Sequence, residues 1–278
     1  MQWLKSRLRS KKNQLTHLID ANGAHLKDLT EIREAAPEYY NELFSQDSYW
    51  NVFPKLVVKR KLTPEARKWL IRPVTKEEVK QAVFQLNAEK APGFDGFTAG
   101  FFQKNWSLVG EETTEAIISF FTSGRLIQEL NHTCIASVPK SLDAIHLNDF
   151  RLIFCCNTLY KFITKILANR LLSVIDGLIS ENQCAFLKDR LISDCFLLSH
   201  ELARDFNKPM GSRACIKIDL KKTFDSTNGE FVYFIMHCIC MGFPTVWINW
   251  IKECIQKSVF SVMINGSCKG FFWQLKGY

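Results

Sequence analysis

The spacing of hydrophobic and polar residues predicts several helices. The clearest pattern covers residues 159–178, where apolar side chains recur every three or four positions. One helix begins after Thr75, which with Glu78 forms a capping box ahead of an apolar stripe. Further helices are predicted at 98–122, 191–206, 226–241 and 244–257.

The N-terminal region is also predicted to be helical. The pattern covers residues 1–48, and Asn22 followed by Gly23 interrupts it. A basic linker punctuated by proline follows at 50–64.

Two hairpins and one further strand are predicted from short apolar or alternating stretches. Residues 133–139 pair with 150–154, and residues 260–267 pair with 270–273 through an Asn-Gly turn. Residues 215–220 alternate, so their apolar side chains should share one face and pack against helices. The predicted fold class is α+β, without internal repeats.

Composition indicates a folded, basic protein. Of the 278 residues, 47% are hydrophobic and 23% charged, which provides a sizeable core and excludes a disordered chain. The net charge is +8, and cation clusters at 1–12 and 51–68 suit a polyphosphate such as a nucleic acid, although a solvated surface would carry them equally well. The second cluster includes Lys55, Lys59, Arg60 and Lys61.

Cysteine usage and the absence of targeting signals favour an intracellular protein. The ten cysteines include no CxxC pair, so we expect free thiols in a reducing compartment, either nucleus or cytoplasm, and no zinc site. There is no secretory signal and no run of about 18–20 apolar residues, so no membrane association is expected.

One carboxylate is a candidate metal ligand. Asp219 is predicted near the end of the strand at 215–220, where it could hold Mg²⁺, and Phe224 could wall an adjacent substrate pocket. The alternative is structural, with Asp219 as a solvated strand-end charge and Asp225 as a helix N-cap.

Two cations on the first predicted hairpin are candidates for binding a triphosphate. Lys140 follows one strand and Arg151 belongs to the other. Arginine offers a bidentate fork to a phosphate, and lysine offers a point charge. As isolated residues they would more often be surface charges.

Eight sequence blocks occur in an order that resembles the reverse transcriptase of non-LTR (LINE-type) retrotransposons, closest to the plant type. The resemblance is close over residues 75–278, a partial reverse transcriptase domain, and looser over residues 1–74, a helical and basic linker region. The blocks are Lys90-Ala-Pro-Gly-Phe-Asp-Gly-Phe, Val138-Pro-Lys, Asp149-Phe-Arg-Leu-Ile, Cys156-Asn-Thr-Leu-Tyr-Lys, Lys165-Ile-Leu-Ala-Asn-Arg-Leu, Ile179-Ser-Glu-Asn-Gln-Cys-Ala-Phe, Lys217-Ile-Asp-Leu-Lys-Lys-Thr-Phe-Asp-Ser and Phe260-Ser-Val-Met-Ile-Asn-Gly-Ser.

The resemblance implies an incomplete right-hand polymerase fold, with fingers, the first part of the palm and an N-terminal helical extension. It implies that Asp219 is the first aspartate that binds Mg²⁺ and that Phe224 screens the sugar of the incoming nucleotide. Lys140 and Arg151 would contact the triphosphate, and the loop that begins at Lys90 would lie near the template. The implied partners are an RNA template, a DNA primer and a dNTP.

The sequence also departs from the family pattern. Phe94 and Leu152 replace prolines, Phe154 stands at a serine and Gly229 at a tryptophan. Asp189 stands at a glycine, which would strain the backbone if the position requires a positive φ.

The family's next block would begin near residue 276, and its second carboxylate motif has no counterpart in the sequence. We therefore expect a truncated reverse transcriptase that is inactive as an isolated chain. The alternative function is a non-enzymatic nucleic-acid-binding remnant. Loss of the later palm strands would leave an exposed edge beside Asp219, which favours aggregation.

Overall fold

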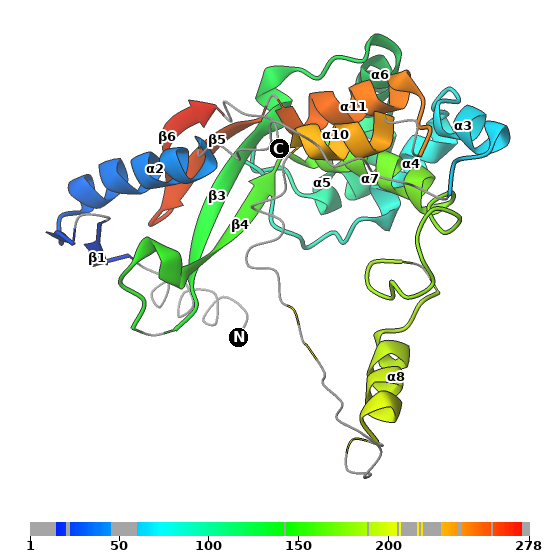
Figure 1. The fold of residues 1–278 in the computed structure, drawn as a ribbon. Helices are drawn as coiled ribbons and strands as arrows, with labels where there is room; N and C mark the ends of the chain where they lie inside the picture. Colours follow the sequence, from blue (N-terminus) through cyan, green and yellow to red (C-terminus); the bar gives the residue numbers. More distant parts are fainter. Residues whose placement is uncertain are drawn as a thin grey trace.

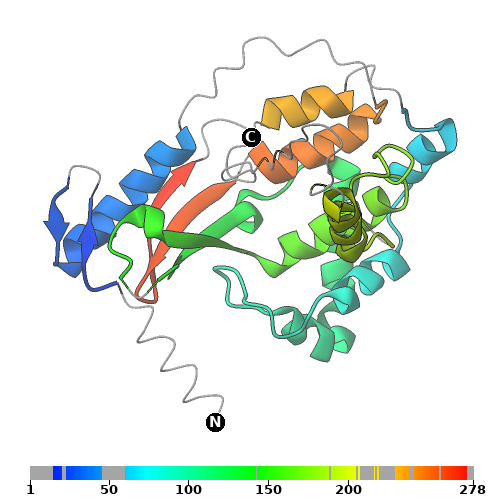
Figure 2. The same cartoon turned by 60° about the horizontal axis from the view of Figure 1, so that its bottom comes forward.

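The computed structural model describes residues 15–20, 23–45, 60–141, 143–187, 189–204, 206, 216, 218, 229–237, 241–256 and 258–273. In Figures 1 and 2 a twisted sheet with the N-terminal elements occupies one side of the molecule, and a body of helices occupies the other. The mixture agrees with the predicted α+β class. None of the described helices combines the length and apolar character needed to cross a membrane.

The sheet has four strands in the order β4-β3-β5-β6. β3 pairs antiparallel with β4 and parallel with β5, and β5 pairs antiparallel with β6. Both predicted hairpins are therefore confirmed, and the parallel β3–β5 contact joins them into one sheet. The strands are β3 (His132–Pro139), β4 (Phe150–Cys156), β5 (Val259–Ile264) and β6 (Ser267–Trp273).

The turn between β5 and β6 follows the predicted Asn-Gly chemistry. Asn265 has a φ of 49° and Gly266 a φ of 86°. A two-residue hairpin turn of the I′ type requires positive φ at both central positions, which asparagine and glycine tolerate best. The Asn265 amide also exchanges hydrogen bonds of 2.9 Å with the backbone of Leu15, so the N-terminal segment covers this turn.

Helix α2 (Leu29–Ser45) packs on one face of the sheet. Its side chains Ile32, Ala36 and Tyr40 are buried with apolar residues of all four strands. Gly270 of β6 has a φ of 61°, and a Cβ there would collide with Pro37 of α2. Glycine is therefore required where the helix approaches the edge strand.

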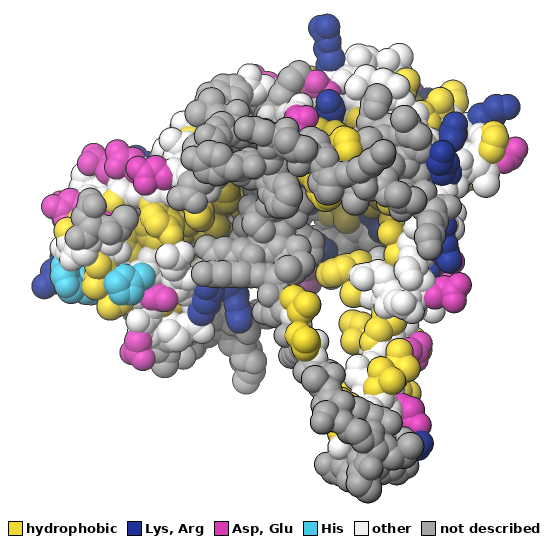
Figure 3. Space-filling view, viewed as in Figure 1, with side chains coloured by type: hydrophobic (Ala, Val, Ile, Leu, Met, Phe, Trp, Pro, Cys, Tyr) yellow, Lys and Arg dark blue, Asp and Glu magenta, His cyan; other side chains and the backbone are white. Residues whose placement is uncertain are grey.

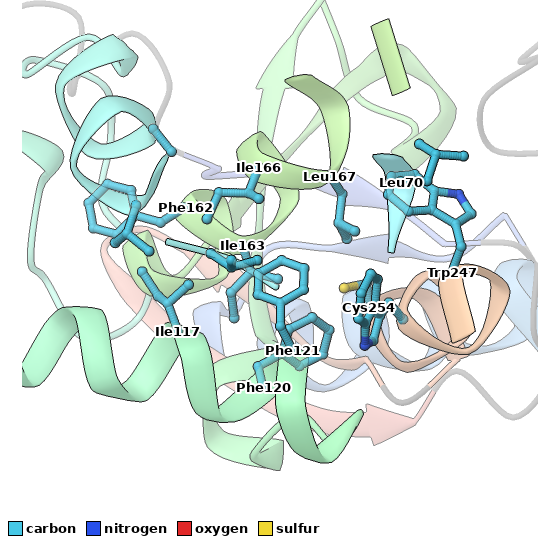
Figure 4. Close-up of a cluster of buried hydrophobic side chains, with 14 of the residues drawn as sticks. Leu70, Ile117, Phe120, Phe121, Phe162, Ile163, Ile166, Leu167, Trp247 and Cys254 are labelled. Carbon is cyan, nitrogen blue, oxygen red and sulfur yellow. The ribbon is translucent and has the colours of Figure 1, made fainter. Parts of the chain in front are cut away.

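The helical body encloses a second, separate hydrophobic core (Figure 4). Large side chains from α6, α7 and α11 fill it, including Phe121, Phe162 and Trp247. The helices of the body are α3 (Pro64–Leu70), α4 (Lys76–Gln85), α5 (Ala99–Lys104), α6 (Trp106–Ser123), α7 (Thr158–Leu172), α10 (Gly229–His237) and α11 (Thr245–Gln256).

Local signals in the sequence explain several helix ends. Thr75 is the N-cap of α4, and its hydroxyl accepts a hydrogen bond of 3.2 Å from the Glu78 amide, which is one half of the predicted capping box. The Glu78 carboxylate is bound by Arg170. Gly124, with a φ of 66°, ends α6 in the left-handed conformation. The predicted helix at 98–122 is divided, because Asn105 ends α5 and starts α6. The predicted helix at 159–178 ends at Leu172, and turns follow.

The region before α2 was predicted to be helical and is a two-stranded hairpin instead. β1 (Leu18–Ile19) pairs with β2 (His25–Leu26) across the predicted break. The Ile19 amide donates a 2.8 Å hydrogen bond to Ile145 at the tip of the β3–β4 hairpin. This contact with a distant segment replaces the helical hydrogen bonds, so the local pattern could not predict it.

Helix α8 (Ile192–Arg204) was predicted and projects from the body in Figure 1. It has no buried residue, and its hydrophobic side chains are visible in Figure 3. The loop before it carries Asp189, which stands where the family has a glycine. Its φ of 62° lies in the left-handed region, so this position does have the positive φ that glycine adopts most easily.

Two further sequence expectations are wrong. The first concerns the cysteines, which were expected to be free thiols, because Cys184 and Cys195 form a disulfide. The loop folds back on α8, and Arg190 holds it by donating to the Ser180 and Gln183 carbonyls. Five other described cysteines are free, as expected.

The second error concerns the strand predicted at 215–220. Its described members Ile216 and Ile218 are outside any strand and are 82% and 79% exposed, so they do not pack against helices. The sheet obtains its third strand from β5 instead, which pairs parallel with β3. The other residues of 215–220 lie outside the described part.

Candidate nucleotide and nucleic-acid interface

The loop over residues 87–98 is held firmly against the start of α7. The Thr158 hydroxyl donates to the Phe97 carbonyl at 2.5 Å, and the Lys161 ammonium donates to the Ala91 carbonyl at 2.7 Å. Gly93 lies so close to Asn157 that any side chain there would collide with it. The predicted template-side loop is therefore an ordered feature, and Lys90 is exposed on it.

Asn157 connects this loop to the segment before β3. Its side-chain amide donates to the Glu129 carbonyl at 2.8 Å, and its side-chain oxygen accepts from the Asp95 amide at 3.5 Å. Because Asn157 is 4% exposed, its polar atoms require these partners. The loop, the hairpin and α7 thus have a fixed relative position.

The β3–β4 hairpin carries the two predicted triphosphate ligands. Arg151 lies opposite Val138 in the strand register, and the Lys140 amide continues the ladder with a 2.9 Å bond to the Asp149 carbonyl. Residues directly opposite in a ladder point to the same face. Lys140 and Arg151 are therefore expected to project from the same side of the hairpin.

Both cations line a pocket of about 320 Å³ beside α2. Tyr39 of α2 also lines it, and its hydroxyl donates to the Asn148 side chain at 2.8 Å. The Lys140 ammonium donates to the Asn148 carbonyl at 2.6 Å. Among the described residues neither Lys140 nor Arg151 has a carboxylate partner. Strand alternation directs the Arg151 side chain, like that of Ile153, to the sheet face opposite α2.

The sheet face opposite α2 is partly exposed, and Ile153 and Met263 are among its exposed side chains. It carries the thiols of Cys134 in β3, Cys155 in β4 and Cys268 in β6. The Cys134 and Cys268 sulfurs are 2.6 Å apart. Burial raises the pKa of Cys134 to about 12. Burial also raises the pKa of Cys155, against the opposing effect of the Lys161 charge. At neutral pH these two thiols are protonated and therefore weak nucleophiles and weak metal ligands.

The remaining predicted site residues are only partly within the described structure. Asp219 and Phe224 lie outside the described residues, as do Lys55 and Lys59. Lys61 is exposed. In the described ranges no group of three or more His, Cys, Asp or Glu side chains is placed to hold a metal ion.

Arg60 differs from its neighbours in the basic cluster. It donates to the Ile179 carbonyl at 3.0 Å and lies 4.0 Å from the Glu181 carboxylate. Its charge therefore fixes the start of the helical body to the segment after α7, which leaves it less available to a nucleic acid than an unpaired cation.

Sequence reasoning missed several residues of this interface. Tyr39 and Asn148 line the pocket, and the sequence gives no signal that they meet, since 109 positions separate them. Asn157 stands within one of the sequence blocks that resemble the family, and its place in that block was the signal that could have identified it. His132 was missed as well; its ring contacts Phe94 of the template-side loop at 4.8 Å between centroids.

Comparison with known proteins supports the family resemblance of the sequence. The family model described as reverse transcriptase (RNA-dependent DNA polymerase) matches residues 138–277. The chain is also 26% identical over 264 residues to the "Transposon TX1 uncharacterized 149 kDa protein" of Xenopus laevis. That match covers 92% of this chain and 20% of the relative, so the chain spans about a fifth of the relative's length.

Proposed function

The chain belongs to the reverse transcriptase (RNA-dependent DNA polymerase) family and comes from a LINE-type element, and we propose that it forms the part that binds the nucleotide and the template. The observation that carries this proposal is the pair of cations without carboxylate partners, Lys140 and Arg151, on the same side of the β3–β4 hairpin. An anion with several oxygens, such as a triphosphate, would satisfy both.

Three other arginines have carboxylate partners within the fold. Arg170 and Arg190 form ion pairs with Glu78 and Asp176, and Arg72 also lies 3.5 Å from Glu78. Arg151, by contrast, is exposed and makes no ion pair with a described residue. A charge that the fold leaves without a partner is available to a ligand, and the position within the family's matched region favours a phosphate.

We propose that the described elements correspond to the fingers and the first part of the palm of a right-hand polymerase. In the family reaction a primer 3′-hydroxyl attacks the α-phosphate of the dNTP, a new phosphodiester bond forms, and pyrophosphate leaves. In this chain Lys140 and Arg151 would hold the triphosphate, Phe224 would exclude the 2′-hydroxyl, and the loop at Lys90 would support the template.

Reverse transcriptases generally use Mg²⁺, and the residue proposed to hold it here is Asp219. Two-metal phosphoryl transfer needs carboxylates from more than one place. Since the sequence offers Asp219 without a recognisable second motif, we propose that the 278-residue chain binds substrates without extending a primer. Within LINE-type elements we propose a plant-type affiliation, which rests on the sequence blocks alone.

The alternative is a nucleic-acid-binding protein that has lost nucleotide recognition. The exposed Lys61 and Lys90 favour it, since neither needs a dNTP. In both cases we propose an intracellular, reducing location, in which the Cys184–Cys195 disulfide would be reduced.

The test measures binding and primer extension with the 278-residue chain and Mg²⁺. We expect dNTP binding that Arg151→Ala weakens, whereas Arg125→Ala, an exposed arginine at the end of α6, leaves it unchanged. RNA binding without dNTP binding would support the alternative. Template-dependent extension that Asp219→Ala abolishes would show that the chain is an active enzyme.

A further inference from the structure

Three aromatic rings meet where the template-side loop reaches the sheet. The Phe94 ring contacts the His132 ring edge-on at 4.8 Å, and the Phe271 ring lies 5.3 Å from the same imidazole. The rings come from the loop, from β3 and from β6, so the fold brings together residues that are far apart in the sequence.

The central ring is buried and the outer two are not. His132 is 7% exposed, whereas Phe94 is 57% and Phe271 is 67% exposed. Neither phenylalanine belongs to either of the two hydrophobic cores. Their exposed surface therefore does not stabilise the fold, and two such rings on one imidazole form an exposed apolar patch.

The backbone holds this patch in place before any ligand binds. Gly93 packs against Asn157, and Lys161 holds the loop through the Ala91 carbonyl. His132 forms a 2.9 Å hydrogen bond with Ser261 of β5. Burial lowers the pKa of His132, so the imidazole is neutral at pH 7 and adds no charge beneath the patch.

Charges of both signs lie around the patch. Lys161 lies under the loop, and Lys90 is exposed on it. The loop also carries Glu89 and Asp95, and the Asp95 carboxylate is engaged by the Phe97 amide at 3.2 Å. The loop itself is therefore not strongly basic, which favours stacking over phosphate binding at this point.

We propose that Phe94 and Phe271 form a stacking platform for an unpaired base of a single-stranded nucleic acid. Every base has an aromatic face, so such a platform holds a strand without selecting its sequence. The inference rests on the proposed function, since it assigns residues that contact the template. Phe94 stands where the family has proline, so this contact is a property of this chain.

The experiment uses the 278-residue chain and a short single-stranded RNA that carries 2-aminopurine. Binding is followed by anisotropy, and stacking by the change in 2-aminopurine fluorescence. We expect Phe94→Ala and Phe271→Ala each to weaken binding about ten-fold and to reduce the fluorescence change. The slope of log K against log salt should not change, because no phosphate contact is lost.

Two variants separate stacking from other effects. Phe84→Ala is the matched control, since Phe84 is 51% exposed on α4 and packs against Trp106 instead. Phe94→Tyr should retain affinity, and Phe94→Leu should lose it although it keeps an apolar side chain. Circular dichroism establishes that each variant folds.

The outcomes distinguish this inference from the proposed function. If the wild-type chain binds RNA and the alanine or leucine variants bind equally well, the stacking platform is wrong and the proposed function stands. If the alanine variants reduce the salt slope, the rings act through phosphates and the inference is also wrong. If the wild-type chain binds no RNA at low salt, both are wrong.

Discussion

The helical body and the β3–β4 hairpin use arginine in opposite ways. In the body, Arg170 is 2% exposed and donates to both oxygens of Glu78 at 2.8 Å. Its remaining donors reach the carbonyls of Leu70, Arg72 and Pro73. On the hairpin, Arg151 is exposed and has no carboxylate partner among the described residues.

The difference shows which cations are structural and which are available. Arg170 donates hydrogen bonds to backbone carbonyls in the segment between α3 and α4. Apolar side chains could not satisfy these carbonyls. Arg151 satisfies nothing in the described part of the fold. A cation of the first kind should affect stability alone, and one of the second kind should affect binding alone.

The largest expected effect is on stability, from Arg170→Ala. Removing one partner of a buried pair costs about 3–5 kcal/mol, because the other partner remains buried without compensation. The measurement is urea unfolding followed by circular dichroism. Arg170→Lys keeps the charge but lacks the planar fork, so it should recover only part of the loss. A change in the free energy of unfolding below about 0.5 kcal/mol, the range of ordinary surface substitutions, would show that Arg170 does not stabilise the fold.

The second prediction concerns Arg151, the exposed arginine of the comparison. Arg151→Ala should leave unfolding unchanged within about 0.5 kcal/mol. Hydrogen bonds to charged groups contribute about 1.5–3 kcal/mol, so dNTP affinity should fall by roughly ten- to one-hundred-fold. Isothermal titration measures the affinity. Equal binding by the wild-type and Arg151→Ala chains would show that the hairpin arginine is not a ligand.

A third prediction concerns the sheet beneath the hairpin. Phe154 replaces the family's serine, and its ring lies 6.1 Å from Phe44 and 6.0 Å from Phe260. It therefore joins α2 to the sheet. Phe154→Ser should destabilise the fold by about 1–2 kcal/mol, since Phe154 is half-buried and loses apolar burial and ring contacts. Thermal unfolding measures this, and Ile153→Ser on the exposed opposite face is the control.

A fourth, smaller prediction concerns Asp189. Its φ of 62° is a conformation that glycine adopts without cost. Asp189→Gly should therefore relieve up to about 1 kcal/mol of local strain. Hydrogen exchange of the loop before α8 should become slower. Faster exchange would show that the aspartate side chain stabilises this loop instead.

Local chemistry predicted the elements whose causes are local. The Thr75 cap and the turn at Asn265 and Gly266 are fixed by neighbouring residues, so pattern reasoning found them. The β1–β2 hairpin depends on Ile145 and on the turn beyond β5, which lie far away in the sequence. A helical pattern could not report those contacts.

The candidate site follows the same division. Lys140 and Arg151 were placed on a hairpin because two short strands flank a loop, and the structure confirms the hairpin. Tyr39 could not be found, since it reaches the pocket only because α2 packs on the sheet. The contact between Phe94 and Phe271 through His132 likewise exists only after β3, β5 and β6 have paired.

The smallest expected effect is a pH dependence at His132. Burial lowers its pKa below the usual 6.5, so the unfolded chain binds a proton more readily than the folded chain. The contribution of neutral His132 to the free energy of unfolding should then be fully present above about pH 6.5, and it should fall as the pH drops toward the folded-state pKa. His132→Gln keeps a polar group that can reach Ser261, and it should flatten this part of the profile. Unfolding by urea between pH 7.5 and 5 measures the slope as roughly one proton or less. An unchanged slope in His132→Gln would assign the pH dependence to another group and would leave His132 as a packing residue beneath the two exposed rings.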